Sequence, residues 1–260
     1  NIFPMWDWVG GRFSTTAATG LLAAGLAGAD IQRILLGARE MDQWTRNEDP
    51  AQNPAARLAA LWYTLRQGPN ARDFVLLPYA DRLQPLSLVV QQLCMESLGK
   101  GITRRGTRNQ QGLTVFGNKG SSDQHAIIQQ LVEGPDQSIV LFIQVLHDDT
   151  PSKQPQLNIG DSLQHLLLGT RKALSKRARP VVTWTIPKID AEAMGATIAL
   201  FERAVGLYGE LVNINAYHQP GVEAGKKAAA AILDLQGRVE AILADGVARS
   251  ADEIRLALGD

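Results

Sequence analysis

Four short segments of this chain combine glycine with polar or charged side chains in patterns that packing alone does not require. In the first, residues 6–14, Gly10 and Gly11 stand directly before Arg12. Paired glycines let the backbone approach a ligand closely, and an arginine beside them offers a fixed positive charge. A tight turn with a surface ion pair between Asp7 and Arg12 would explain the same residues, and spacing alone leaves that alternative open.

The second segment, residues 95–101, places Glu96 in the last turn of an otherwise apolar helix. A carboxylate is disfavoured there because the C-terminal end of the helix dipole is negative. An unfavourably placed carboxylate is a candidate proton acceptor, which suits a general base. The alternative is a solvent-facing glutamate paired with Lys100.

The third segment, residues 117–125, carries glycine and serine ahead of a predicted helix, with His125 in the first turns of that helix. Amide-rich helix N-termini of this kind hold phosphate groups, and a histidine there could act as an acid or a base. The segment is not a Walker A loop, because Lys119 precedes the second glycine instead of following it. A structural histidine with Ser122 and Asp123 as simple helix caps is the alternative.

In the fourth segment, residues 213–227, a polar break leads into a helix with Lys226 in its early turns. A cation is unfavourable near a helix N-terminus, so binding of an anionic substrate would explain its presence. A solvated lysine beside Glu223 is the alternative.

The elements that must position these segments alternate between strand and helix. Short apolar runs predict buried strands at 74–77, 113–116, 138–146 and 181–186. Apolar periodicity and capping residues predict helices at 14–28, 30–44, from Pro54 onward, 86–98, 121–132 and 160–177. We expect the helix at 14–28 to be buried all round because it is rich in alanine and glycine.

This alternation predicts an α/β fold with a doubly wound, mostly parallel sheet of four to five strands and helices on both faces. In such sheets the ligand crevice lies at the carboxyl ends of the strands. We expect residues 1–190 to form one α/β domain with preceding linker helices. Residues 191–260 are expected to form a helical C-terminal segment that packs on it.

The composition is that of a globular protein, with 260 residues, 45% hydrophobic and 20% charged. Lysine and arginine together equal aspartate and glutamate, so no overall field draws the chain to nucleic acid or to an anionic membrane. No apolar run is long enough to predict a transmembrane helix, and the N-terminus does not resemble a signal peptide.

The single cysteine, Cys94, excludes an internal disulfide and argues against a thiolate metal site. Its apolar neighbours predict a buried structural thiol, as in a protein of the reducing cytoplasm. The chain also begins without methionine on residues that read like the interior of a domain, which we interpret as a sign of truncation.

Taken together and in this order, the four segments resemble the glucose-6-phosphate isomerase family over essentially the whole chain. The departures are Phe13 for tyrosine, Ser122-Asp123 for Asn-Gly, and Tyr217-His218 for Phe-Asp, and they resemble a bacterial branch. The matching motifs are Trp-Asp-Trp-Val-Gly-Gly-Arg-Phe-Ser (6–14), Met-Glu-Ser-Leu-Gly-Lys (95–100), Gly-Ser-Ser-Asp-Gln-His (120–125) and Gly-Val-Glu-Ala-Gly-Lys (221–226).

The resemblance implies isomerisation of glucose 6-phosphate and fructose 6-phosphate through a cis-enediol(ate), in glycolysis and gluconeogenesis, without metal or cofactor. Glu96 corresponds to the base that moves a proton between C2 and C1, and Arg12 to the cation that stabilises the intermediate. His125 and Lys226 correspond to the groups that open the sugar ring. The positions that match substrate-holding residues are Gly11, Gln92 and Gln219.

The family has two sugar-isomerase-type domains, and this sequence resembles the C-terminal portion, beginning near the end of the first domain. The family's phosphate-gripping loop lies upstream. Its active sites sit at a homodimer interface, with the histidine supplied by the second subunit. The resemblance therefore implies a cytoplasmic enzyme whose C-terminal half alone has little activity. A non-catalytic sugar-phosphate-binding module and an isomerase of mannose 6-phosphate are the alternatives.

Overall fold

The computed structural model describes residues 2–66, 71–147 and 159–259, without the side chains of 159–161. Contacts group the chain into two compact units, Asn1–Tyr217 and His218–Asp260. The helix α8 (Ala191–Leu211) therefore belongs to the same unit as the sheet. The division of the chain into an α/β domain up to residue 190 and a helical segment from 191 stays a prediction.

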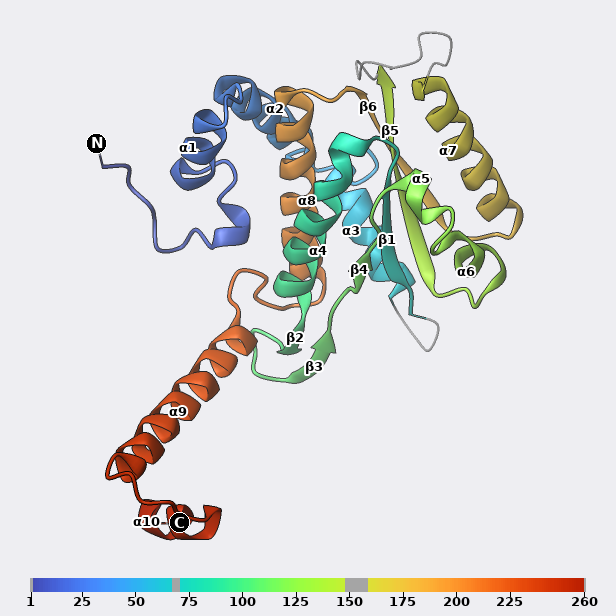
Figure 1. The fold of residues 1–260 in the computed structure, drawn as a ribbon. Helices are drawn as coiled ribbons and strands as arrows, with labels where there is room; N and C mark the ends of the chain where they lie inside the picture. Colours follow the sequence, from blue (N-terminus) through green and yellow to red (C-terminus); the bar gives the residue numbers. More distant parts are fainter. Residues whose placement is uncertain (1, 67–70, 148–158, 260) are drawn as a thin grey trace. The chain divides into compact units, whose positions relative to one another are not determined.

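The first unit is built on a sheet of four parallel strands in the order β4-β1-β5-β6 (Figure 1). All four lie where apolar runs predicted strands. The chain passes from β1 outward to β4 and then returns to the other side of β1, so the order reverses between β1 and β5. The strands are β1 (Asp73–Pro78), β4 (Val115–Phe116), β5 (Ser138–His147) and β6 (Val181–Lys188).

Helices cover both faces of this sheet, which confirms the doubly wound architecture. Along β1, Phe74 and Leu76 enter one core with side chains from α3, α4 and α8, while Val75 and Leu77 enter a second core with α6 and α7. Successive strand residues point to opposite faces, so a continuous apolar run serves two helix layers. The helices are α3 (Pro54–Leu65), α4 (Gln84–Leu98), α6 (Ile128–Glu133) and α7 (Ile159–Lys176).

The helices α2 (Ile31–Trp44) and α8 pack closely because each offers a glycine at the contact (Figure 1). A Cβ atom on Gly37 would lie 1.8 Å from a backbone oxygen of α8, and one on Gly195 would lie 2.0 Å from a backbone oxygen of α2. The predicted helix at 30–44 is confirmed, and the Asp30 side chain caps its start by accepting from the Arg33 amide. The buried residues of α2 are Gly37 and Met41, so glycine placement sets the packing face.

The prediction that residues 14–28 are buried all round is wrong. They form α1 (Ala18–Leu26), in which no residue is buried, and Leu26 is 82% exposed. Within this chain α1 packs mainly against α2, so most of its apolar surface lacks a neighbour among the described residues.

The predicted helix at 121–132 is broken into α5 (Gly120–Asp123) and α6, with turns at 124–127. The Asp123 carboxylate accepts from the Asn118 amide at 2.8 Å, and Gln124 turns to donate to the hydroxyl of Tyr79 at 3.1 Å. These side-chain bonds compete with a continuous helix. His125 therefore lies in the connection between two short helices.

A two-stranded antiparallel hairpin follows α4 and was not predicted. It consists of β2 (Lys100–Ile102) and β3 (Arg108–Gln111). The β3 segment is entirely polar, so it lacks the apolar alternation by which strands are recognised. The hairpin places Lys100 directly after the last turn of α4.

The second unit contains α9 (Pro220–Leu243) and α10 (Ala251–Leu258). The Ser250 side chain and Glu253 form a capping box at the start of α10, and Arg238 donates to the Leu258 carbonyl at 2.8 Å. No residue of α9 is buried, and Leu233 is 67% exposed.

Cys94 is fully buried on α4, as predicted, and burial raises the pKa of its thiol. A basic run at residues 171–179 covers the last turns of α7 and the residues just after it, where Arg177 pairs with Glu133. Across the described ranges, every helix is too short or too polar to cross a lipid bilayer.

Candidate active site

Arg12 and Glu96 come together where a one-turn helix, η1 (Gly11–Phe13), packs against the C-terminal end of α4. Their side chains form an ion pair with 3.8 Å between Nη1 and Oε1. The Arg12 side chain is 2% exposed and that of Glu96 is 22% exposed. The guanidinium is thus a buried, fixed charge, while the carboxylate keeps access to solvent or to a ligand.

Two further bonds hold the guanidinium in place. Arg12 Nε donates to the Ser97 Oγ at 2.6 Å, and Arg12 Nη2 donates to the Ala216 carbonyl at 2.7 Å. Burial lowers the pKa of Arg12, and the nearby Glu96 carboxylate opposes that effect. The guanidinium nevertheless stays charged at all physiological pH values. The alternative of a surface ion pair between Asp7 and Arg12 is wrong, because Arg12 is buried against other partners.

An aromatic pair flanks the guanidinium. The Phe13 ring centroid is 5.3 Å from the Arg12 Cζ and 5.1 Å from the Tyr217 ring. A cation near an aromatic face is stabilised by the ring quadrupole, and the rings also limit access of water.

Glu96 is also held by Gln92, one turn earlier on α4. Gln92 Nε2 donates to Glu96 Oε2 at 3.2 Å, which leaves the Oε1 facing Arg12. The structure therefore brings together Arg12, Glu96 and Gln92, three of the seven predicted site residues. Gly11 belongs to the same η1 turn, and a Cβ added there would meet nothing within 4 Å.

Lys100 does not pair with a solvent-facing Glu96 carboxylate, which was the alternative reading of that segment. Its side chain turns inward, the residue is 5% exposed, and Nζ donates to the backbone carbonyls of Glu96 and Ser97 at 2.8 and 2.7 Å. The sequence predicted no role for Ser97, and it predicted for Lys100 only the ion pair with Glu96. Both stand inside the motif around Glu96, and their burial was the property that the sequence did not show.

His125 lies away from this centre. The loop before it is fixed at the other end of α4, where Gln84 Nε2 donates to Asn118 Oδ1 at 2.7 Å and Ser87 Oγ donates to the Asn118 carbonyl at 3.0 Å (Figure 1). Gln84 and Glu96 are at opposite ends of α4, about 18 Å apart along its axis. His125 is exposed. One copy of this chain does not place His125 beside Glu96.

The expected phosphate-binding features of residues 117–125 are engaged within the chain. The Asn118 amide donates to Asp123, and Lys119 Nζ pairs with Asp81 Oδ1 at 2.9 Å. An anion would have to compete with both carboxylates. Asp123 lies within α5, and neither α5 nor α6 has a side-chain cap hydrogen bond, so Asp123 does not cap either helix and instead binds the Asn118 amide in the loop before α5.

Lys226 and Gln219 belong to the second unit. Lys226 Nζ pairs with Glu223 Oε1 at 3.0 Å, and both side chains are more than half exposed. Gln219 is the N-cap residue of α9. The contact with Glu223 is the solvated pair that the sequence left as the alternative reading.

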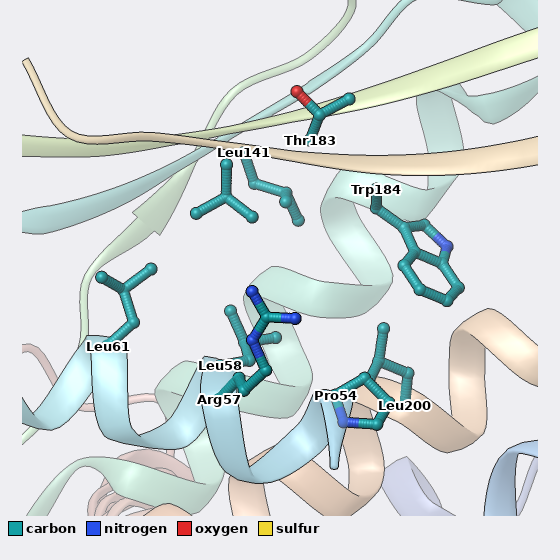
Figure 2. A pocket seen from close by; sticks show the side chains of 9 residues that line it. Pro54, Arg57, Leu58, Leu61, Leu141, Thr183, Trp184 and Leu200 are labelled. Atoms are coloured by element: carbon teal, nitrogen blue, oxygen red, sulfur yellow. The ribbon is translucent and has the colours of Figure 1, made fainter. Parts of the chain in front are cut away.

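A mainly apolar pocket beside the sheet does not include these residues. A pocket of about 450 Å³ lies between α3, β5, β6 and α8, and Figure 2 shows the Arg57 guanidinium pointing from α3 into it. Its other lining is mainly apolar, so it offers few donors for a sugar phosphate. A second pocket, of about 480 Å³, is lined by Phe13, Tyr217 and residues of α2 and α8, including Glu202.

The chemical capacity of the centre is that of one accessible carboxylate beside one buried cation. Such a pair can accept a proton from carbon while stabilising negative charge on an adjacent oxygen. Among the described residues, His, Cys, Asp and Glu side chains form no group of three that could hold a metal ion.

Comparisons with known proteins match nearly the whole chain. The family model described as Phosphoglucose isomerase matches residues 1–167 and 161–245. A glucose-6-phosphate isomerase of Synechococcus sp. (strain CC9605) is 60% identical over 99% of this chain and 49% of the relative, and one of Geobacter sp. (strain M21) is 55% identical over 94% and 46%. The chain thus spans about half the length of the curated relatives it matches.

Two solved structures also match this chain. The crystal structure of a glucose-6-phosphate isomerase from Chlamydia trachomatis matches with a TM-score of 0.81 at 25% identity, over 90% of this chain and 48% of that chain. A hypothetical protein from Thermus thermophilus matches with a TM-score of 0.76 at 29% identity, over 86% of this chain and 55% of that chain.

Proposed function

The chain belongs to the phosphoglucose isomerase family, and we propose that the complete protein interconverts glucose 6-phosphate and fructose 6-phosphate through a cis-enediol(ate). The single observation that carries this proposal is the accessible Glu96 carboxylate held 3.8 Å from the buried guanidinium of Arg12. We assign the complete protein to the cytoplasm and to glycolysis and gluconeogenesis on the same family membership.

The chemistry follows from the two charges. A proton on carbon next to a carbonyl is weakly acidic, so a base alone removes it slowly. Glu96 takes the proton from C2 of the open-chain aldose and returns it to C1, and the Arg12 charge stabilises the oxygen that becomes negative. Removing one such electrostatic stabiliser typically lowers the rate by about 10²- to 10³-fold. Gln92, bonded to Glu96, is placed to orient the base or a substrate hydroxyl.

The other assigned residues complete the proposal. His125 and Lys226 open and close the sugar ring, and Gly11 and Gln219 contact the substrate. His125 lies at the far end of α4 from Glu96, which supports a homodimer in which each active site takes His125 from the second subunit. Exposed aromatic side chains near Arg12 support a covering partner or further chain, since Trp6 is 54% exposed and Trp8 is 73% exposed.

Glu96→Gln in the complete protein tests the catalytic role. We expect loss of turnover in a coupled assay for glucose 6-phosphate formation, with substrate binding retained, because the amide keeps the shape but cannot accept a proton. Glu133→Gln is the matched control, because Glu133 also ends a helix and pairs with an arginine, Arg177, away from the site. Normal turnover by Glu96→Gln would refute the assignment. Sugar-phosphate binding without any turnover by the wild type would favour a non-catalytic binding module.

We further propose that these 260 residues alone bind and convert substrate poorly. The chain spans about half the length of its curated relatives, and the resemblance places the phosphate-gripping loop in the half that the chain does not cover; in addition, α1 carries apolar side chains with little cover. The test compares kcat/KM of the 260-residue chain with that of the protein made from its whole coding frame. Near-equal values would refute this part of the proposal. Parallel assays with mannose 6-phosphate define the preference at C2.

A further inference from the structure

Lys100 is a buried lysine at the end of the helix that carries Glu96. The residue is 5% exposed and follows Gly99, the C-cap of α4. Lysine is rarely buried to this degree without a specific partner. Here the partners are two backbone oxygens, those of Glu96 and Ser97, at 2.8 and 2.7 Å from Nζ.

These bonds complete the end of α4. The last carbonyls of a helix have no partner within it. The Gly99 amide donates to the Met95 carbonyl at 3.0 Å, and the Lys100 ammonium donates to the carbonyls of Glu96 and Ser97. A buried carbonyl without a donor is unfavourable, so the ammonium determines how the last turn of α4 is held.

That turn supports both charged groups of the proposed active site. Glu96 projects from it, and Ser97, which is fully buried, accepts the hydrogen bond from Arg12 Nε. A shift of the turn would therefore move the carboxylate and loosen the guanidinium together. The positive charge of Lys100 also opposes the negative end of the helix dipole beneath Glu96.

The charges of these groups interact. Burial and the Arg12 charge lower the pKa of Lys100 to about 8, while the Glu96 carboxylate opposes that shift. Arg12 of η1 and Glu96 of α4 are the charged groups that act on it among the described residues. Gln111, which pairs with Lys100 across the β2–β3 hairpin, is neutral and is bonded by the Tyr208 hydroxyl of α8 at 3.3 Å.

We propose that Lys100 is a positioning residue for the isomerase reaction, because its ammonium fixes the last turn of α4 and thereby the Glu96 carboxylate and, through Ser97, the Arg12 guanidinium. This inference rests on the proposed function. Lys100 acts through its neighbours and does not contact the substrate.

The test is Lys100→Met in the complete protein, which keeps the length of the side chain and removes its charge and donors. We expect kcat to fall about 10- to 100-fold, since a displacement of about 1 Å at a reacting group costs rate on that scale. KM is expected to change less than about threefold, because the substrate contacts remain. The matched control is Lys176→Met, an exposed lysine in the last turn of α7, with kcat unchanged.

A second measurement separates positioning from general loss of structure. The probe is an analogue of the intermediate, a sugar-acid phosphate that carries a carboxylate in place of the enediolate. Lys100→Met should bind this analogue more weakly than the wild type by about the factor by which kcat falls, and should bind the substrate with unchanged affinity. A folded Lys100→Met variant with wild-type kcat and analogue affinity overturns the inference.

The pH dependence of kcat is a separate test that does not require Lys100→Met to fold. The kcat of the wild type should decline as the pH rises through about 8, where Lys100 loses its proton. Lys100→Arg retains the charge and should shift that decline to higher pH. A wild-type kcat that stays constant well above that pH overturns the inference. A wild type without any isomerase activity would refute the proposed function, whereas an active wild type with an equally active Lys100→Met refutes only the role of Lys100.

Discussion

The hydrogen bond from Arg12 to Ser97 offers a direct test of how the buried cation is held. Ser97→Ala removes the Oγ that accepts from Arg12 Nε at 2.6 Å and leaves the Ala216 carbonyl and Glu96 as partners. Ser97 is fully buried, so water does not readily replace the lost acceptor. Hydrogen bonds to charged groups contribute about 1.5–3 kcal/mol.

That free energy bears on both stability and rate. We expect Ser97→Ala to lower the free energy of unfolding by about 2 kcal/mol, measured by urea denaturation of the complete protein. If about half of that 2 kcal/mol, roughly 1 kcal/mol, is lost in the transition state, kcat/KM should fall roughly fivefold. The reason is that a looser guanidinium stabilises the developing oxygen charge less well.

A matched control separates the two effects. Thr197 is also fully buried, and its Oγ1 accepts from the Trp184 indole nitrogen at 3.1 Å, far from the proposed reaction. Thr197→Val should lower stability while kcat/KM stays within about twofold of the wild type. If Ser97→Ala and Thr197→Val have the same kcat/KM, the reasoning about Arg12 is refuted. The assay is isomerisation of fructose 6-phosphate coupled to oxidation of glucose 6-phosphate.

Three further predictions concern other parts of the chain. Unfolded Glu96→Gln and Glu96-intact His125→Ala proteins that are mixed and refolded together should recover about a quarter of wild-type activity. Half of the dimers are then mixed, and each mixed dimer has one intact site out of two. No recovery would exclude a site shared between subunits. Gly37→Ala should destabilise the protein by about 3 kcal/mol, because its Cβ would meet the α8 backbone at 1.8 Å, whereas Gly169→Ala on α7 has open space and should be neutral or stabilising in urea denaturation. Burial raises the pKa of Glu202 from 4.5 to about 7, so the folded state binds this proton more tightly than the unfolded state and wild-type stability falls as the pH rises between these values. Above pH 7, Glu202→Gln should therefore be more stable than the wild type by about 1–2 kcal/mol, and this difference should vanish near pH 4.5. A difference in stability that does not change with pH would contradict this prediction.

Much of the architecture was predictable because its signals are local. Each strand of the four-stranded sheet is an apolar run between breakers, and the run at 74–77 contributes to two cores because alternate residues face opposite helix layers. Asp30 and Pro54 mark helix starts at the predicted places because their effects act within one turn. The errors arose where distant contacts override local preference. Gln124 bonds across to Tyr79 and Thr170, and the helix predicted at 121–132 breaks beside His125.

The exposure of α1 is an error of a different kind. Small apolar residues predict a buried helix, but burial depends on a neighbour, and within the described chain α1 has little more than α2. The polar β2–β3 hairpin shows the reverse case, since its pairing follows from the position of the chain after α4 and not from apolar alternation.

By itself, the sequence determined the α/β class, the order of the four sheet strands along the chain, the family and the residue types that carry the chemistry. Motifs and apolar periodicity involve residues that are close together in the sequence, so they can be recognised without the tertiary structure. Only the tertiary structure decided which of those residues meet. It joined Arg12 to Ser97 and Ala216 across separations of 85 and 204 residues, and it buried Lys100 under the last turn of α4. It also placed His125 at the other end of that helix. A charge becomes a fixed catalytic element only when distant chain segments remove it from water and supply its partners, and no local pattern specifies that.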